Sequence, residues 1–217
     1  MKRFLFLLLV TLSVSSCHIG RMIVYNVADV NDYKKSPQLP LHKSDKPFHF
    51  SEKLLSELDT AAFPKRFITE DEKITNWESL FSETKTTSFL IIKNDTIKYE
   101  KYFLGRDENS IMTSFSANKA FISALVGIAV AEGKITSVKD PITKYLTDFK
   151  NPGFEKITIE NLLNMESGIR FRENYFNPVA EIGKYYYGNN LKKYVPNLKV
   201  EKDPGTEFQY RSVNTLL

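Results

Sequence analysis

Two Ser-x-x-Lys tetrapeptides are the residues of this sequence best suited to chemistry. One runs from Ser82 to Lys85 and the other from Ser116 to Lys119. On a helix, this spacing brings the lysine amine next to the serine hydroxyl on one face. A lysine held in a desolvated pocket can lose its proton and act as a base toward the serine, or it can stay charged and polarise its neighbours. The motif is weakly specific by itself, because two copies occur in 217 residues.

Other catalytic constellations are missing. The histidines are His18, His42 and His49, so no histidine follows residue 49, and this argues against a Ser-His-Asp triad. The G-x-S-x-G, H-E-x-x-H, G-x-G-x-x-G and P-loop patterns are also absent. Cys17 is the single cysteine, which excludes an intrachain disulfide and a multi-cysteine zinc site. We therefore expect no metal and no cofactor.

The elements predicted around the two copies differ. Ser116 and Lys119 precede an almost uninterrupted apolar run over residues 120–131, and Gly133 stands where a helix C-cap belongs. A helix that is apolar on every side is predicted to be buried on every side, and its N-terminus stabilises developing negative charge. The copy at Ser82 lies in a polar segment instead. A capping serine with a snorkelling lysine is the alternative for Ser116, and spacing and burial alone do not decide between the two.

The remaining patterns predict an α/β or α+β fold. Residues 88–93 and 96–102 are rich in β-branched and aromatic residues and flank Asn94-Asp95, which predicts a β-hairpin. The other predicted elements are a short helix near residues 51–58, a capped helix that starts at Thr158 and ends near Gly168, and a long surface excursion over residues 170–200. Strands on one side and helices elsewhere predict a sheet flanked by helices.

Composition and charge narrow the partners. Hydrophobic residues make up 42% and charged residues 26%, which is typical of a globular protein. The net charge is 30 − 26 = +4, and Lys2 and Arg3 carry two of those positive charges. The balance from Cys17 onward is therefore 28 − 26 = +2, which is too small to indicate a nucleic-acid partner.

The amino terminus predicts export. A cationic start, an apolar run of about eleven residues and small residues before Cys17 are typical of a secretory signal, and the run is too short to span a bilayer. Val14-Ser15-Ser16-Cys17 resembles the lipobox of bacterial lipoproteins. We expect a lipoprotein signal peptide over residues 1–16 and lipidation of Cys17, with the protein anchored to the cell envelope and facing the periplasm or exterior. An ordinary secretion signal with an unrelated cysteine is the alternative.

Several short sequence segments after residue 85, called blocks here, resemble segments of the serine beta-lactamase superfamily and occur in the same order as they do there. The most similar branch is its class C-like group, with DD-peptidases, esterases and 6-aminohexanoate-dimer hydrolases. The blocks are residues 114–119, 124–127, 132–135, 140–146, 157–168 and 204–212. The resemblance implies a beta-lactamase/transpeptidase-like fold, with an antiparallel sheet flanked by helices and a mostly helical region. It divides the chain into the signal peptide, a tether with a short helix over residues 17–60, and a partial hydrolase domain over residues 61–217.

The resemblance also implies roles for individual residues. Ser116 is the implied nucleophile, Lys119 its activating partner, and Tyr210 a proton relay whose phenol lies near the lysine. Ser212 stands where the family usually has Asn, and Asn214 follows two residues later; both are candidate substrate-binding residues, although a hydroxyl lacks the fork of an amide. The family's third motif follows the tyrosine and is not among these residues. The sequence therefore reads as a fragment that ends before the late strands, and we expect the 217-residue form to be inactive by itself.

These inferences predict a serine hydrolase that transfers an acyl group through Ser116, without a cofactor. Its substrate would be a small-molecule or peptide amide or ester, and its membrane contact would be the lipid anchor. A true beta-lactamase or DD-peptidase is one alternative. The other is a catalytically inactive, penicillin-binding-like protein of the cell envelope that binds its partner through the surface of Tyr185, Tyr186 and Tyr187.

Overall fold

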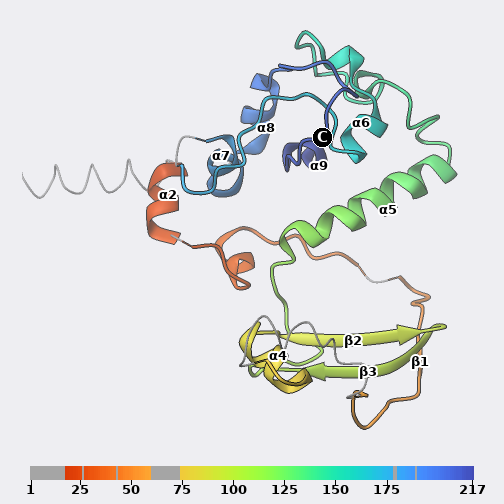
Figure 1. Cartoon of the computed structure of the whole chain (residues 1–217). Helices are drawn as coiled ribbons and strands as arrows, with labels where there is room; N and C mark the ends of the chain where they lie inside the picture. The colour runs from red at the N-terminus through yellow and green to blue at the C-terminus, as the bar shows by residue number, and fades with distance from the viewer. Residues whose placement is uncertain (1–17, 26, 43, 60–73, 178–179, 189) are drawn as a thin grey trace, which may run out of the picture. The chain divides into compact units, whose positions relative to one another are not determined.

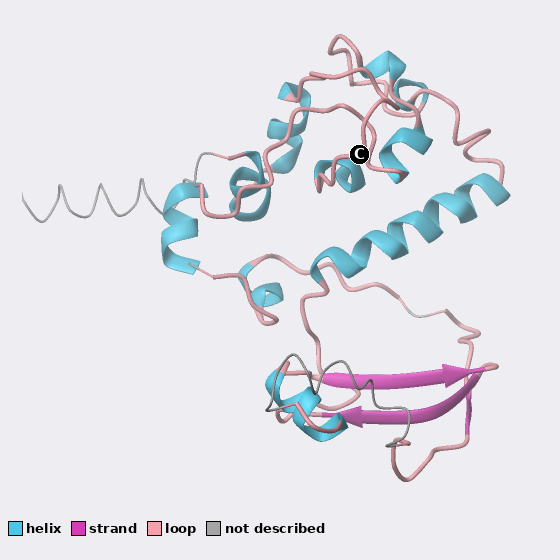
Figure 2. Ribbon diagram, in the orientation of Figure 1, coloured by secondary structure: helices cyan, strands magenta, loops and turns pink. Residues whose placement is uncertain are grey.

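The computed structural model describes residues 18–25, 27–42, 44–59, 74–177, 180–188 and 190–217. The chain divides into two compact units, which are described separately below. A helical unit combines the segment before Asn31 with Ser114–Leu217, and a sheet unit comprises Asn31–Thr113. Figure 1 labels the elements of both units, and Figure 2 separates helices from strands by colour.

The sheet unit contains a three-stranded sheet in the order β1-β3-β2. Its strands are β1 (Ser51–Glu52), β2 (Ser88–Lys93) and β3 (Thr96–Tyr102), and β2 and β3 pair antiparallel. Asn94 and Asp95 form the connecting turn, each with φ of 51°, a conformation that these two residue types tolerate. The predicted hairpin is therefore confirmed.

Aromatic side chains hold helix α4 (Trp77–Glu83) in the sheet unit. The ring of Phe81 lies 4.8 Å from that of Phe89 on β2 and 5.0 Å from that of Phe103, measured between centroids. Such tilted aromatic pairs add to the free energy of burial. Asn76 caps the helix by accepting a hydrogen bond from the Ser79 N–H at 2.9 Å.

The helix predicted near residues 51–58 is wrong. Ser51–Glu52 form β1, which pairs parallel with the start of β3. The Lys53 N–H donates to Ile97 O at 3.0 Å and the Leu55 N–H donates to Lys98 O at 2.7 Å. The sheet edge thus satisfies backbone groups that a helix would have bonded internally, and no local pattern in these residues signals that distant pairing. Within the tether, the 3-10 helix η1 covers Asp32–Lys35.

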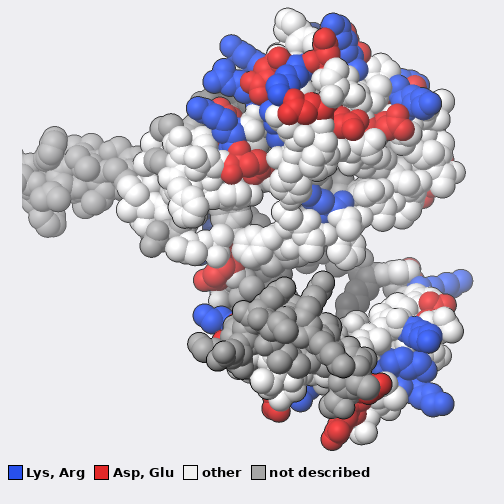
Figure 3. Space-filling model, viewed as in Figure 1, with Lys and Arg blue, Asp and Glu red and all other residues white. Residues whose placement is uncertain are grey.

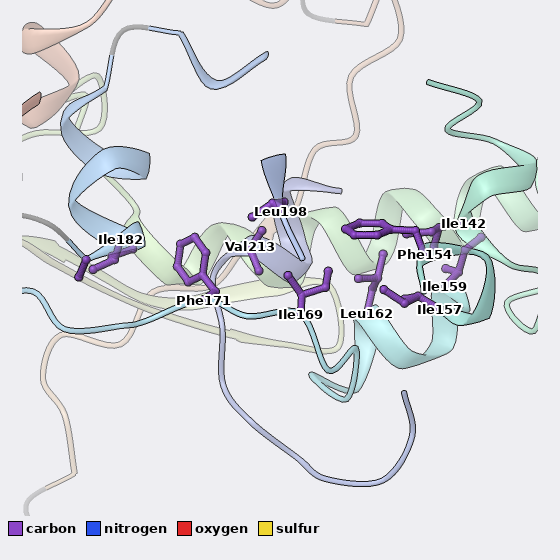
Figure 4. Close-up of a cluster of buried hydrophobic side chains, with 11 residues drawn as sticks. Ile142, Phe154, Ile157, Ile159, Leu162, Ile169, Phe171, Ile182, Leu198 and Val213 are labelled. Carbon is purple, nitrogen blue, oxygen red and sulfur yellow. The ribbon is translucent and has the colours of Figure 1, made fainter. Parts of the chain in front are cut away.

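The helical unit is built from short helices around a small core. Its α-helices are α2 (His18–Tyr25), α5 (Asn118–Ala131), α6 (Ile159–Leu163), α7 (Glu181–Tyr187), α8 (Leu191–Tyr194) and α9 (Val213–Leu216). Its 3-10 helices are η3 (Phe115–Ala117), η4 (Ile142–Lys144), η5 (Phe154–Lys156) and η6 (Val195–Asn197). Phe154, Ile157, Ile169 and Val213 are completely buried, and Figure 4 shows them within one apolar cluster. Figure 3 shows acidic and basic side chains interspersed over the visible face of this unit.

Helix α5 has the predicted range but not the predicted burial. Gly133, with φ of 72°, follows its C-terminus as expected. None of the residues of α5 is buried, and the side chains of Phe121, Leu125 and Ile128 are 68%, 58% and 52% exposed. Val126 on another side packs against the apolar cluster. Uniform apolarity shows what a helix could bury, but the number of covered faces depends on the neighbouring elements.

The surface excursion predicted over residues 170–200 is also wrong. The segment forms α7, α8 and η6, and it contributes four buried side chains to the core: Phe171, Ala180, Ile182 and Leu198. These apolar residues are widely spaced among Tyr, Asn and Lys, so their pattern has neither a helical nor a strand period. The start of the helix predicted from Thr158 is confirmed, because a Thr158–Asn161 capping box begins α6. Its predicted end near Gly168 is wrong: α6 ends at Leu163, and Met165 already has a left-handed φ of 61°.

A backbone pairing between residues 165–170 and residues 199–209 brings the last block of the chain beside the end of α6. The Arg170 N–H donates to Lys199 O at 2.7 Å, the Glu201 N–H to Gly168 O at 2.9 Å and the Gln209 N–H to Met165 O at 2.9 Å. Gly168 has φ of +67°, and a Cβ there would lie well within 3.0 Å of the Lys202 carbonyl oxygen. Only glycine permits this close approach. The pairing fixes the course of the chain that leads to residue 210.

Candidate active site

Ser116 and Lys119 meet at the junction of η3 and α5. Ser116 lies in η3, and Lys119 lies in the first turn of α5, where its Nζ donates to Ser116 Oγ at 3.1 Å. The serine is exposed and the lysine is half-buried. The three-residue spacing therefore produces the predicted contact, with the hydroxyl accessible to a ligand.

The residue before Ser116 has an unusual backbone. Phe115 has φ of 46°, which is the left-handed region that residues with a side chain rarely adopt. Its ring stacks on that of Tyr186 in α7, with centroids 6.4 Å apart. Local backbone strain of this kind costs free energy and is maintained only where surrounding contacts support it. The conformation sets the direction in which the Ser116 side chain leaves the backbone.

Tyr210 and Ser212, which come from the last residues of the sequence, complete the cluster around Lys119. Lys119 Nζ lies 5.1 Å from the centroid of the Tyr210 ring and donates to Ser212 Oγ at 3.4 Å. The structure thus brings together four of the five residues predicted for substrate chemistry. Lys119 is the common contact of Ser116, Tyr210 and Ser212.

The surroundings of Tyr210 favour its phenolate. Burial alone would raise the pKa of Tyr210, but interaction with the Ser116 hydroxyl and with the Lys119 ammonium outweighs it, and the pKa lies below the usual value for tyrosine. The negative charge of Glu173 acts in the opposite direction. A phenol with a lowered pKa is deprotonated more often near neutral pH, so it can accept a proton from a neighbouring hydroxyl.

Asn214 lines the same cavity as Lys119 but makes its hydrogen bonds elsewhere. It is buried, and its Oδ1 accepts a hydrogen bond from Ser167 Oγ at 2.6 Å, while its Nδ2 donates to Met165 Sδ at 3.4 Å. Both polar ends of the amide are therefore engaged inside the unit. Of the two candidate substrate-binding residues, Ser212 contacts Lys119, whereas the Asn214 amide is bonded to Ser167 and Met165.

The second Ser-x-x-Lys copy lacks the geometry of the first. Ser82 lies in α4, which ends at Glu83, and Lys85 follows with φ of 51°. The left-handed residue turns the chain before the lysine can complete a helical turn over the serine. Both side chains are exposed, and the Lys85 N–H donates to the Ser82 carbonyl oxygen at 3.0 Å. Spacing alone therefore did not distinguish the two copies.

Sequence reasoning missed Glu173. Its Oε1 accepts a hydrogen bond from the Ser212 N–H, and its buried Oε2 has no hydrogen-bond partner among the described residues. Burial and the charge of Glu173 raise the pKa of the neighbouring Tyr175 to about 12, so this phenol stays protonated at neutral pH. No motif includes Glu173, and the only signal is its position a few residues after the block at 157–168.

The predictions about metal binding and about the export signal concern the whole sequence, of which the structure describes only part. Among the described residues, there is no group of three or more His, Cys, Asp or Glu side chains that could hold a metal ion. None of the helices within the described ranges is long and apolar enough to cross a membrane. Cys17 and the predicted signal peptide lie outside those ranges.

Comparison with known proteins gives consistent matches. Residues 75–217 match the protein family described as Beta-lactamase. The chain is 25% identical over 153 residues to a 6-aminohexanoate-dimer hydrolase from Paenarthrobacter ureafaciens, a match that covers 66% of this chain and 39% of that protein. The structure of the present chain is similar to that of a putative 6-aminohexanoate-dimer hydrolase from Bacillus anthracis, with a TM-score of 0.61 and 24% identity. The match covers 79% of the present chain and 47% of the Bacillus anthracis chain. The likeness confirms the predicted fold, and the chain spans less than half the length of either relative.

Proposed function

Because this chain belongs to the beta-lactamase family, we propose that it is a serine hydrolase that acts by acyl transfer on an amide or ester substrate. The observation that carries the proposal is the position of Lys119 Nζ, which is 3.1 Å from Ser116 Oγ and 5.1 Å from the centre of the Tyr210 ring. An accessible hydroxyl, a cation and a phenol of lowered pKa are the groups that a nucleophilic mechanism requires.

In the proposed reaction, Ser116 is the nucleophile and Tyr210 carries the proton. Ser116 Oγ forms a bond to the acyl carbon as its proton passes to the Tyr210 phenolate. Tyr210 then gives that proton to the leaving nitrogen or oxygen, and the bond between the acyl carbon and the leaving group breaks. Water attacks the resulting ester and passes a proton to Tyr210, which returns it to Ser116 Oγ as the acid product leaves.

Lys119 supports this cycle as a cation. Its ammonium contacts the hydroxyls of Ser116 and Ser212 and lies over the Tyr210 ring. The positive charge favours the phenolate, which keeps a proton acceptor beside the nucleophile. A charged donor also strengthens the hydrogen bonds that hold the two hydroxyls in place.

A linear amide is the first candidate substrate class. Its support is the name of the relatives, which are 6-aminohexanoate-dimer hydrolases. Ser212 offers one hydroxyl where an amide side chain would offer a donor and an acceptor together, so it can make one fewer contact with a substrate amide. A panel of substrates would distinguish a linear amide from the alternatives, which are beta-lactams and peptidoglycan peptides.

We also propose that the protein is exported and carries lipid on Cys17. The support is the apolar run that ends in Val-Ser-Ser-Cys. Membrane fractionation of the wild type and of Cys17→Ala in the native host tests this proposal. The wild type should stay with the membranes and the variant should be released, whereas equal release of both would exclude a lipid anchor.

The test of the hydrolase is labelling of the full-length protein by a fluorophosphonate, with turnover of a linear amide, an ester and a beta-lactam measured in parallel. Ser116→Ala should abolish both labelling and turnover, because it removes the attacking oxygen. Ser82→Ala is the matched control and should behave as the wild type. Absence of labelling in a folded wild type would favour the catalytically inactive binding protein.

A further inference from the structure

We propose that Glu173 is a positioning residue of this site. Its carboxylate holds the backbone of Ser212, and its negative charge counteracts the positive charge of Lys119 at the Tyr210 phenol. The inference rests on the proposed function, because it assigns a role within the same reaction. Glu173 belongs to none of the sequence blocks that led to the nucleophile. Its role follows from contacts that only the folded chain shows.

The first contact links Glu173 to Lys119 through one residue. Glu173 Oε1 accepts the Ser212 N–H, and Ser212 Oγ accepts a hydrogen bond from Lys119 Nζ at 3.4 Å. Ser212 is itself 5% exposed, so little of its surface is open to water that could replace these partners. The carboxylate therefore fixes the backbone from which the Ser212 hydroxyl reaches the lysine.

The second observation concerns the other oxygen of the carboxylate. Glu173 Oε2 is buried and has no hydrogen-bond partner among the described residues. A buried carboxylate oxygen without a donor at hydrogen-bond distance is costly, because it has lost its water. The charge of this carboxylate acts on the phenols of Tyr175 and Tyr210, which gives it an electrostatic role in addition to its contact with the Ser212 backbone.

The two residues before Glu173 are held by their own contacts. Arg172 Nε and a terminal guanidinium nitrogen donate to the two carboxylate oxygens of Glu181 at 2.7 Å and 3.0 Å, and the Arg172 N–H donates to the same residue at 3.1 Å. Phe171 is buried in the core. This bidentate pair ties Arg172, the residue before Glu173, to the first residue of α7.

The charged and titratable groups around the site act in two directions. Lys119 and the Ser116 hydroxyl favour the phenolate of Tyr210, and Glu173 disfavours it. Tyr175 and Tyr185 also interact with Glu173, and Glu173 raises the pKa of each of these phenols. The carboxylate thus keeps the neighbouring phenols protonated and limits how far Lys119 lowers the pKa of Tyr210. The Tyr210 phenolate is therefore a stronger base than it would be if Lys119 acted on it without Glu173.

The test is Glu173→Gln in the full-length protein, with the acylation rate of an activated ester measured as a function of pH. Glutamine keeps an oxygen that can accept the Ser212 N–H but removes the charge. The pKa of Tyr210 should fall, so the acid limb of the pH–rate profile should move to lower pH by about 0.5 to 1 unit. Glu207→Gln is the control, because the exposed Glu207 pairs with Lys202 and Gln209 rather than with Tyr210, and its profile should match the wild type.

A second variant separates charge from positioning. Glu173→Ala removes the acceptor of the Ser212 N–H as well, so it should show the same shift and a further loss of maximal rate, about 5- to 10-fold. Superimposable profiles of wild type and Glu173→Gln would overturn the electrostatic part of the proposal. Equal maximal rates for Glu173→Ala and Glu173→Gln would overturn the positioning part.

Failure of the proposed function gives a different result. The ultraviolet absorbance of ionised tyrosine, measured as the difference between a protein and its Tyr210→Phe variant, reports the pKa of Tyr210 without any turnover. That pKa should be lower in Glu173→Gln than in the wild type, even if Ser116 were not the nucleophile. An unchanged pKa in a folded Glu173→Gln would overturn the inference, whereas loss of acylation in the wild type concerns the hydrolase proposal alone.

Discussion

Replacing Gly168 by alanine tests the backbone pairing that places Tyr210 and Ser212 beside α5. Gly168 has φ of +67°, and its added Cβ would lie well within 3.0 Å of the Lys202 carbonyl oxygen, a separation that real Cβ atoms essentially never show. Gly133 offers a matched control in the same unit. It has φ of +72°, but no atom lies within 4 Å of a Cβ built there.

The two substitutions should differ in cost because only one of them produces a clash. Each alanine must adopt a left-handed conformation, which costs about 1–2 kcal/mol. At Gly168 the backbone must also move away from Lys202, and this weakens the hydrogen bonds that Gly168 O accepts from Glu201 N at 2.9 Å and from Lys202 N at 3.3 Å. Two such bonds are worth about 1 kcal/mol each, so we expect about 3–4 kcal/mol for Gly168→Ala.

Urea unfolding of the full-length protein, followed by far-ultraviolet circular dichroism, measures both values. Gly168→Ala should lower the free energy of unfolding by about 2 kcal/mol more than Gly133→Ala does, and it should also reduce acylation of Ser116. Equal losses for the two variants would show that the close approach to Lys202 has no energetic consequence.

Three further predictions follow from individual contacts. Hydrogen bonds from Arg172, opposed by desolvation, lower the pKa of Glu181 from 4.5 to about 2. This lowered pKa means that the ion pair stabilises the fold above about pH 4.5 and that the contribution is lost as the pH falls toward 2. Because the Arg172 side chain is half exposed and solvent screens the pair, Glu181→Gln should flatten the acid part of a stability–pH curve and cost only about 0.5–1 kcal/mol at neutral pH, as urea unfolding would show. Asn214→Ala should cost about 1–3 kcal/mol, because it leaves the buried Ser167 hydroxyl without its acceptor, and a variant as stable as the wild type would contradict that contact. Tyr210→Phe should melt at the wild-type temperature yet acylate about 10²- to 10⁴-fold more slowly in a stopped-flow assay, and an unchanged rate would exclude the phenol as proton carrier.

The features that the sequence predicted correctly depend on residues that are close together along the chain. Asn94-Asp95 needed only its flanking strands to form a turn, and Gly133 needed only the preceding helix. The contact between Ser116 and Lys119 likewise arises within one turn. Short-range geometry of this kind is determined by backbone conformation, which local residue types largely decide.

The features that were missed depend on partners far along the chain. The Glu173 carboxylate meets the Ser212 N–H across 39 residues, and Ser167 meets Asn214 across 47 residues. The edge strand β1 forms because β3 presents free backbone groups to it, which residues 51 and 52 cannot signal. The exposure of Phe121 shows the same limit, since apolar composition does not say which neighbours a helix face will have.

In the proposed reaction, Ser116 is the residue that becomes acylated. Peptide mapping by mass spectrometry of the full-length protein, after reaction with a fluorophosphonate, identifies the modified residue. We predict a single adduct on the peptide that contains Ser116, with the Ser82 peptide unmodified, because only Ser116 has a lysine amine 3.1 Å from its hydroxyl. An adduct on Ser82, or undiminished labelling of Ser116→Ala, would contradict both the site and the mechanism built on it.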